Sequence, residues 1–279
     1  MFDYKKFIES IKEEDIRSGD HSTLASIPAD LKGVARFIYK DNGVLAGLQE
    51  VKHIVNAWDA SMHIDFTKKD GEYIEGNKEI GIIEGSVHTI LQIERTLLNI
   101  MQRMSGIASL TRLYKKEIEG TDAQLLDTRK TTPLIRYFEK EAVRIGGGQN
   151  HRAGLYDMIM LKDNHIDFSG GISKALDKTY KYLNDNNLNL KVEVECSDLS
   201  DVKEVLSYGK VDRIMLDNFT PEEILEALPI INKKMETEAS GGINLKNVRS
   251  YALTGVDFIS IGALTHQATS KDISLKAEF

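Results

Sequence analysis

The sequence predicts an α/β protein in two parts, an opening α+β unit and a longer region that forms a barrel of parallel strands. The opening part, up to about residue 120, mixes helical and strand-like patterns without regular alternation. From residue 121 onward, seven short apolar runs recur between helical stretches. Strands that alternate with helices are typical of βαβ units and a parallel sheet, and this many units favour a barrel over a doubly wound sheet.

The opening part begins with a helical spacing of apolar residues over 3–14 and a polar turn at 17–23. A long pattern rich in Leu, Ile and Met predicts a helix over 88–118. Between them, the strand-like stretches are 34–39, 43–46, 63–66 and 80–86, and a helical one is 51–58. We therefore expect a mostly antiparallel sheet here.

Seven runs are the expected strands of the second part. They are AQLLDTRK (123–130), AVRIGGG (142–148), DMIMLKDNH (157–165), KVEVEC (191–196), RIMLDN (213–218), KMETEASGG (234–242) and FISIGA (258–263). Seven strands are fewer than the eight of a complete TIM barrel.

Composition excludes several classes of protein. The chain has 279 residues, 28% of them charged and four of them Pro, as in an ordinary globular protein. No apolar run approaches the ~20 residues that span a bilayer, and the N-terminus lacks the apolar core of a secretory signal. The single cysteine, Cys196, fits a reducing cytoplasm. A net charge of −7 argues against nucleic-acid binding, so an anionic ligand needs a local cluster of Lys and Arg.

Such a cluster follows the expected strands. Polar and glycine residues at or just after their carboxyl ends are Arg129, Lys130, His151, Arg152, Lys162, Glu195, Asp217, Ser240, Gly241, Gly242 and Gly262. In α/β barrels the carboxyl ends of the strands form the active-site mouth. We therefore expect an enzyme that binds a polyanion.

Some other features give weaker evidence for a functional site. The glycines at 146–148 match no nucleotide-binding pattern, and the backbone N–H groups at 240–242 suit a phosphate only in this context. Cys196 alternates with Glu195 and is expected in the core. His53, His63 and His88 lack metal-ligand spacing and are expected to be structural or exposed.

The motifs at these strand ends resemble those of quinolinate phosphoribosyltransferase. They are LLDTRKTTPLIR (125–136), GGGQNHRAGLYDMIMLKDNHI (146–166), VEVE (192–195), IMLDNF (214–219), EASGGI (238–243) and VDFISIGALTH (256–266). Upstream, SGDHST (18–23) and ERTLLNIMQRMSGIAS (94–109) match as well, so the resemblance covers nearly the whole chain in order. One departure is that the family usually has Gly after the Pro of DTRKTTP, where this chain has Leu134 and Ile135.

The resemblance implies an N-terminal α/β sandwich domain at 1–107, with the tail 267–279 packed back on it, and an incomplete seven-stranded TIM-like barrel at 108–266. It also implies a cytoplasmic homodimer in which the N-terminal domain of one subunit faces the barrel mouth of the other. Assembly beyond the dimer stays open. No nucleic-acid or membrane partner is expected.

The resemblance also implies the roles of individual residues. Arg129, Arg152 and Lys162 match residues that hold quinolinate, with Thr128 in the same motif, His151 beside them and Arg95 contributed by the partner subunit. Lys130, Glu195 and Asp217 match residues around the ribose and pyrophosphate. Residues matching the 5′-phosphate loops are Ser240, Gly241, Gly242, Ser260, Gly262 and Ala263.

The expected chemistry suits these groups. Guanidinium groups bind carboxylates bidentately, and quinolinate has two adjacent carboxylates. Phosphoribosyl pyrophosphate needs Mg²⁺, which prefers oxygen ligands, so Glu195 and Asp217 serve either as metal ligands or as acceptors for the ribose hydroxyls. After decarboxylation, the ring proton comes from Lys162, Lys130 or water.

Three alternatives make different predictions. A phosphoribosyltransferase for nicotinate would release pyrophosphate without CO₂, and three arginines and a lysine favour the dicarboxylate over it. A non-catalytic sensor would bind quinolinate tightly without turnover. A barrel aldolase or isomerase would use a Schiff-base lysine, which borohydride traps with a carbonyl substrate.

Overall fold

The structure is a computed structural model that describes residues 2–278 and contains two compact units. Unit 1 comprises Met1–Arg112, Thr132–Gly146 and Gln267–Phe279, and unit 2 comprises Leu113–Thr131 and Gly147–His266. The units are discontinuous in sequence, because the segment 132–146 and the C-terminal segment cluster with the N-terminal part of the chain.

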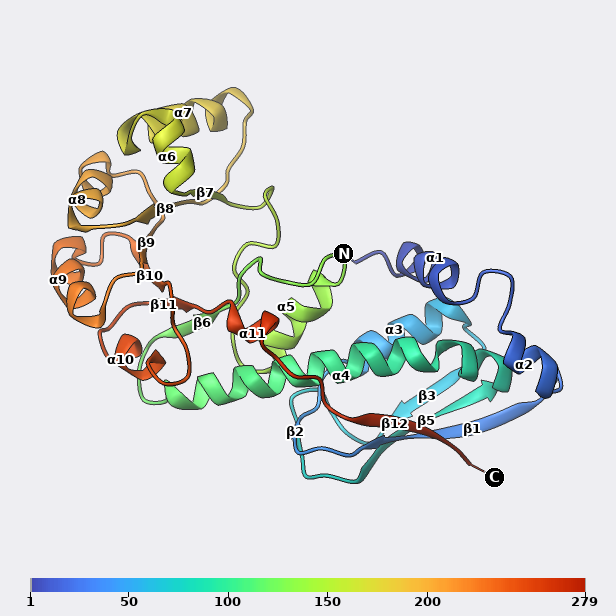
Figure 1. Cartoon of the computed structure of the whole chain (residues 1–279). Coiled ribbons are helices and arrows are strands. Elements are labelled where there is room, and N and C mark those ends of the chain that lie inside the picture. Colours follow the sequence, from blue (N-terminus) through green and yellow to red (C-terminus); the bar gives the residue numbers. More distant parts are fainter. Residues whose placement is uncertain (1, 279) are drawn as a thin grey trace. The chain divides into compact units, whose positions relative to one another are not determined.

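Unit 1 is built on a four-stranded antiparallel sheet in the order β12-β1-β5-β3 (Figure 1). Its strands are β1 (Lys32–Tyr39), β3 (His63–Phe66), β5 (Lys78–Ser86) and β12 (Ile273–Glu278). Short strands β2 (Gly43–Val44) and β4 (Tyr73–Ile74) form a separate antiparallel pair. The predicted antiparallel sheet is therefore confirmed, and β12 brings the end of the chain to β1.

Four helices of this region are α1 (Tyr4–Asp15), α2 (His21–Ser26), α3 (Leu48–Trp58) and α4 (Val87–Glu117), whose last residues belong to unit 2. Helix α4 confirms the long helix expected over 88–118. Its buried stripe follows helical spacing and comprises Ile93, Leu97, Met101, Met104 and Ala108. The polar turn expected at 17–23 is only partly correct, because the Asp20 carboxylate accepts a hydrogen bond from the Thr23 N–H at 3.1 Å and starts α2.

The run 142–148, expected as a strand, is not one. Residues Arg136–Ile145 form helix α5, whose buried face includes Phe138, Ala142 and Val143. Glu139 on α5 is fully buried and accepts hydrogen bonds from Arg103 Nε at 2.9 Å and from the Thr132 N–H at 3.0 Å. These bonds tie α5 to α4 and explain why it clusters with unit 1.

Unit 2 contains a six-stranded parallel sheet in the order β6-β11-β10-β9-β8-β7. Its strands are β6 (Gln124–Leu126), β7 (Ile159–Leu161), β8 (Val192–Cys196), β9 (Arg213–Asp217), β10 (Glu236–Ser240) and β11 (Phe258–Ser260). Among the described residues, the expected seventh strand is reduced to a single parallel bridge between Gln149 and Leu126. The fold is thus a TIM-like α/β barrel that is incomplete, as predicted.

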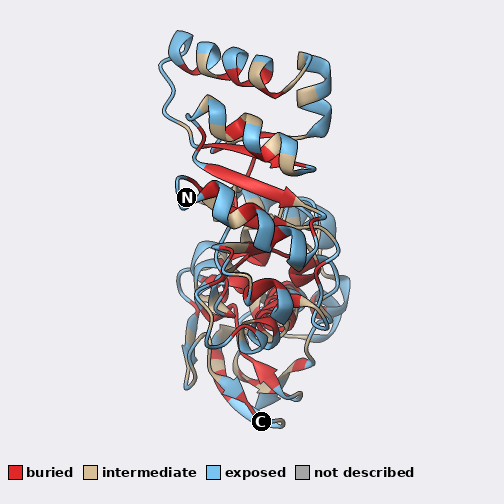
Figure 2. Cartoon of the chain, turned by 90° about the vertical axis from the view of Figure 1, so that its left-hand side faces the viewer, coloured by how far each residue is buried: buried red, intermediate tan, exposed pale blue. Residues whose placement is uncertain are grey.

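The helices of unit 2 are α6 (Asp163–Ser169), α7 (Ile172–Asp185), α8 (Leu199–Tyr208), α9 (Pro221–Ile231), α10 (Val248–Ala252) and α11 (Ala263–His266). Helices α7 to α10 line the outer face of the curved sheet (Figure 1). The strands are mostly buried and the helices expose their outer sides (Figure 2). No described helix has the length and apolar character needed to cross a membrane.

Candidate active site

Strand alternation explains which side chains face the inside of unit 2. Successive side chains of a strand point to opposite faces, so Glu193 and Glu195 of β8 share one face, and Arg213 and Asp217 of β9 share it in register. Val192 and Val194 point the other way, toward the helices. Because all six strands are parallel, their carboxyl ends lie at one edge, near which the predicted site residues of unit 2 stand.

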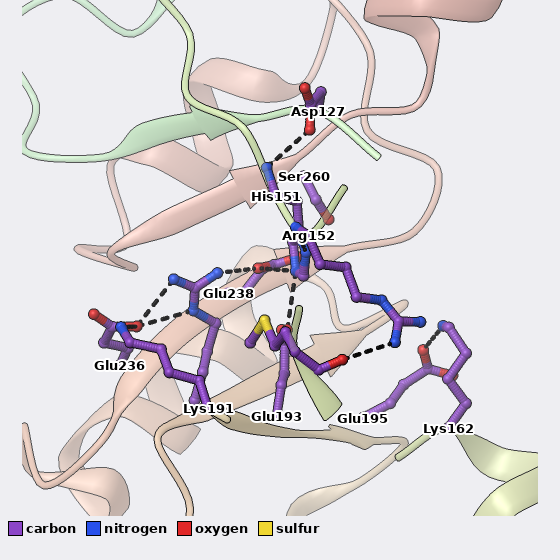
Figure 3. A network of polar contacts seen from close by, with 12 residues as sticks. Asp127, His151, Arg152, Lys162, Lys191, Glu193, Glu195, Glu236, Glu238 and Ser260 are labelled. Atoms are coloured by element: carbon purple, nitrogen blue, oxygen red, sulfur yellow. Dashed lines mark hydrogen bonds and ion pairs between the residues drawn. The ribbon is translucent and has the colours of Figure 1, made fainter. Parts of the chain in front are cut away.

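Lys162 and Glu195 meet at the ends of neighbouring strands. Lys162 follows β7 and precedes α6, while Glu195 is the penultimate residue of β8. The Lys162 ammonium forms an ion pair with the Glu195 carboxylate (Figure 3). The carboxylate is buried and the lysine is partly exposed, so the pair holds a cationic N–H donor at the edge of the site.

Lys130 lies against the turn after β11. A Cβ atom placed on Gly262 would lie 2.8 Å from Cδ of Lys130, so a larger residue here would displace this lysine side chain from its present position. The backbone around it is fixed as well, because the Lys130 N–H donates to Thr128 Oγ1 at 3.0 Å and the Lys130 carbonyl accepts from Thr265 Oγ1 at 2.8 Å.

The turn after β10 is an open cradle of backbone. Asp217 and Ser240 are partners in the β9–β10 register, and the Asn218 N–H donates to the Ser240 carbonyl at 2.8 Å. Gly241 and Gly242 have φ angles of +95° and +62°, and no atom lies within 4 Å of the position a Cβ would take on Gly242. Consecutive left-handed glycines expose backbone N–H groups to an anion.

Two arginines share the site. Burial lowers the pKa of Arg152, and repulsion from the Arg129 guanidinium lowers it further. Arg152 Nη1 donates to the Met158 carbonyl at 3.3 Å, whereas Arg129 is exposed. A dianion placed between two guanidinium groups would relieve their repulsion.

Below the mouth, the structure reveals a buried charge network that the sequence analysis did not identify. His151 Nε2 lies 2.9 Å from Glu193 Oε2 and 3.3 Å from Glu238 Oε2 (Figure 3). Arg213 Nη1 donates to Glu238 Oε2 at 2.9 Å. Burial alone would lower the pKa of His151, but its contacts with Glu193 and Glu238 outweigh burial and raise it to about 9. Burial raises the pKa of Glu193 to about 7.

A signal for this network was present in the sequence. In VEVE (192–195) and ETEAS (236–240), acidic residues alternate with smaller uncharged ones, which is typical of a strand with one polar face. Of the acidic residues in these runs, the sequence analysis names only Glu195 as a site residue, because a buried glutamate is expected only where residues of other strands balance its charge.

The remaining residues named in the sequence analysis differ in their burial and in the unit to which they belong. Ser260 is buried at the end of β11 and its Oγ donates to the Ala239 carbonyl at 3.5 Å, and Ala263 is buried at the start of α11. Arg95 is exposed on α4 within unit 1, unlike the rest, which belong to unit 2. Cys196 is buried, and burial raises the pKa of its thiol, so its expected place in the core is confirmed.

The three histidines expected to be structural or exposed also fit that expectation. His53 and His63 are exposed, and His88 Nε2 lies 3.0 Å from the Ile27 carbonyl oxygen.

Known proteins align with nearly the whole of this chain. Family models described as quinolinate phosphoribosyl transferase, N-terminal and C-terminal domain, match residues 20–105 and 107–276. A chloroplastic carboxylating nicotinate-nucleotide pyrophosphorylase from Arabidopsis thaliana is 43% identical and aligns over 99% of this chain and 83% of its own length. A probable enzyme of the same name from Bacillus subtilis is 38% identical over 97% of this chain and 92% of its own. The crystal structure of nicotinate-nucleotide pyrophosphorylase from Ehrlichia chaffeensis has a TM-score of 0.89 at 38% identity and covers 99% of both chains.

Proposed function

The chain belongs to the quinolinate phosphoribosyltransferase family, and from this premise we propose which residues carry out its reaction. The enzyme transfers the phosphoribosyl group of phosphoribosyl pyrophosphate to quinolinate and removes one carboxylate as CO₂. Its products are nicotinate mononucleotide, pyrophosphate and CO₂, as de novo NAD biosynthesis requires. The observation that carries the assignment of residues is the convergence of Arg129, Arg152, Lys130 and Lys162 on the carboxyl edge of the parallel sheet.

Arg129 and Arg152 form the quinolinate clamp. Burial and then repulsion from Arg129 lower the pKa of Arg152, and two adjacent carboxylates on a planar ring supply the matching negative charge. Bidentate contacts fix the orientation of the ring as well as its charge. Lys162, held by Glu195, adds a third cation, and Thr128 shapes the loop that carries Arg129.

The phosphoribosyl group occupies the other half of the mouth. The backbone N–H groups around Gly241 and Gly242, together with Ser240, bind the 5′-phosphate. The second phosphate loop is formed by Ser260, Gly262 and Ala263, and Lys130 packs on it to reach the pyrophosphate.

Glu195 and Asp217 face the ribose and pyrophosphate. Their carboxylate oxygens are of the type that Mg²⁺ prefers, so they would hold the ion directly, through water, or bind the ribose hydroxyls instead. When bound, the ion neutralises charge on the leaving pyrophosphate. Lys162 and Asn218, which contact these carboxylates here, keep both side chains turned toward the mouth.

Positioning and electrostatics carry the chemical steps, since the one cysteine is buried in the core. The pyridine nitrogen forms a bond to the ribose carbon as the bond to pyrophosphate breaks, through an oxocarbenium-like transition state. The ring becomes cationic, so the bond to the 2-carboxylate breaks with its electron pair left on the ring, and CO₂ leaves. A proton from Lys162, Lys130 or water then completes nicotinate mononucleotide.

The proposal includes a cytoplasmic homodimer in which Arg95 completes the partner's site. Support comes from the position of Arg95, which is exposed on α4 of unit 1 and therefore accessible to another subunit.

A coupled assay tests the function. Quinolinate labelled in its 2-carboxylate and phosphoribosyl pyrophosphate should release labelled CO₂ and pyrophosphate in equal amounts. Pyrophosphate release from nicotinate, with no CO₂ from quinolinate, would replace this function with that of a non-decarboxylating transferase.

A further inference from the structure

Two of the proposed binding cations, Arg129 and Lys130, lie on a loop between β6 and α5 that forms neither helix nor strand. Both residues are exposed. On the β6 side of the loop, the Lys130 N–H donates to Thr128 Oγ1 at 3.0 Å, and the Lys130 carbonyl accepts from Thr265 Oγ1 at 2.8 Å. A cation on a loop gives a precise binding site only if the rest of the loop is held as well.

The other end of this loop is held by one buried carboxylate. Glu139 lies in the first turn of α5 and is fully buried. Its Oε2 accepts a hydrogen bond from the Thr132 N–H at 3.0 Å, and its Oε1 accepts one from Thr132 Oγ1 at 2.9 Å. The carboxylate therefore binds the backbone and the side chain of the same residue, which fixes both the position and the orientation of Thr132.

Arg103 of α4 holds this carboxylate in turn. Its Nε and Nη2 lie 2.9 and 2.8 Å from Glu139 Oε1, and its Nη1 donates to the Ala268 carbonyl at 2.7 Å. Replacing a buried ion pair by packed apolar residues is often neutral or stabilising, so stability alone does not account for these charges. An apolar pair could fill the same space, but it could not accept two hydrogen bonds from Thr132.

The anchor is close enough in the chain to act on the cations. Only Thr131 separates Thr132 from Lys130, and planar peptide groups leave two soft torsions per residue, so a shift of Thr132 moves Lys130 as well. A misplacement of about 1 Å costs an enzyme up to about 100-fold in rate.

We propose that Glu139 and Arg103 are positioning residues that hold the loop at Thr132. The anchor fixes where Arg129 and Lys130 present their cations to quinolinate and to the pyrophosphate group. Arg103 acts through Glu139, and Glu139 acts through Thr132. This inference rests on the proposed roles of the two cations in substrate binding.

The first test is the kinetics of two variants that loosen the anchor from opposite sides. Thr132→Val removes the hydroxyl donor from an exposed residue and leaves the ion pair between Glu139 and Arg103 intact, so it should raise the KM for quinolinate and the KM for phosphoribosyl pyrophosphate about threefold to tenfold. Glu139→Gln removes the charge and should raise both values about tenfold to 100-fold. Thr132→Ser, which keeps the hydroxyl, should retain KM values close to those of the wild type.

Val143→Ala is the matched control for stability. Val143 is fully buried on the same helix, and its side chain offers the loop no hydrogen bond. The smaller side chain should lower the midpoint of chemical denaturation and leave both KM values unchanged, because KM does not depend on the concentration of active enzyme while the protein stays mostly folded. Equal increases in KM for Val143→Ala and Glu139→Gln would overturn the proposal.

The second test measures the anchor without substrate. Amide hydrogen exchange followed by mass spectrometry should be slower for a peptide covering residues 128–134 in the wild type than in Glu139→Gln, because the Thr132 N–H loses its acceptor, and Val143→Ala should resemble the wild type. Equal exchange in the wild type and Glu139→Gln would overturn the proposal, as would unchanged KM values in both Thr132→Val and Glu139→Gln. Wild-type enzyme that releases no CO₂ from quinolinate would instead refute the proposed function, and the exchange measurement would stand apart from it.

Discussion

Gly241→Ala should disturb the turn after β10, which is the proposed cradle for the 5′-phosphate, more than a methyl group added elsewhere in this turn. The Gly241 backbone has a φ angle of +95°, which L-residues rarely adopt. The new Cβ would lie 2.2 Å from Asn218 Oδ1 and 2.8 Å from the Asn218 backbone nitrogen. Both distances are far shorter than van der Waals contact, so Asn218 or the turn has to move.

The expected magnitude follows from two contributions. A non-glycine residue in a sparsely populated region costs about 1–3 kcal/mol. Moving Asn218 weakens its N–H bond to the Ser240 carbonyl, which is 2.8 Å long and contributes about 0.5–1.5 kcal/mol. Gly241→Ala should therefore lower the free energy of unfolding by about 2–4 kcal/mol.

Chemical denaturation and steady-state kinetics measure the two consequences. If the cradle binds phosphate, the KM for phosphoribosyl pyrophosphate should rise tenfold or more, the equivalent of about 1.4 kcal/mol, while quinolinate affinity by calorimetry stays the same. Gly242→Ala is the matched control for stability, because its Cβ would meet no atom within 4 Å and its cost is about 1 kcal/mol from the backbone alone. Equal loss of stability in both variants would refute the steric argument.

Other predictions concern the clamp, the carboxylates and the interface. Arg152→Ala should lose about 2–4 kcal/mol of quinolinate binding by calorimetry, with partial rescue by Arg152→Lys, and unchanged affinity would remove it from the clamp. Asp217→Asn should lower turnover without unfolding, and an unaltered Mg²⁺ titration would confine Asp217 to the ribose hydroxyls. Leu134 is 93% exposed, has a φ of +68° and occupies the family's usual glycine position. Glycine adopts this backbone conformation without the strain of a side chain, so Leu134→Gly should raise the free energy of unfolding by about 0.5–1 kcal/mol. A decrease in the free energy of unfolding would contradict this. Arg95→Ala and Arg129→Ala should each be inactive yet dimeric. An equal mixture of the two after random subunit exchange should recover about a quarter of wild-type activity, because about half of the dimers are heterodimers and each of these has one intact site, whereas heterodimers without activity would exclude a shared site.

Local patterns were sufficient for most elements of the fold. The stripe on α4 repeats every three or four residues, and the short strands of unit 2 are apolar runs between polar turns, so both are visible within a short window of sequence. The run 142–148 was misassigned because its apolar residues belong to the end of an amphipathic helix. The partners that bury this helix, such as Arg103 for Glu139, lie far away in the sequence.

The candidate site was predictable where its residues stand at strand ends, and the network below it was not. Lys162 and Glu195 needed only the rule that parallel strands end at one edge. Glu193 and Glu238 come from different strands and meet at His151, which lies in a loop. Three segments of chain must be placed before that contact can be recognised, and the alternation in each strand shows only that one face is polar.

The alternation of the strands connects the mouth with the network beneath it. Glu195 and Ser240 each stand two residues after a buried glutamate of the same strand, Glu193 and Glu238, and face the same side. If these glutamates were unbalanced, their charge would offset the cations that bind quinolinate. Arg213 and His151 supply compensating N–H donors inside the barrel, so the field at the mouth remains that of its arginines and lysines. A chain with a net charge of −7 can thus bind a dianion, because its inner carboxylates are balanced where they are buried.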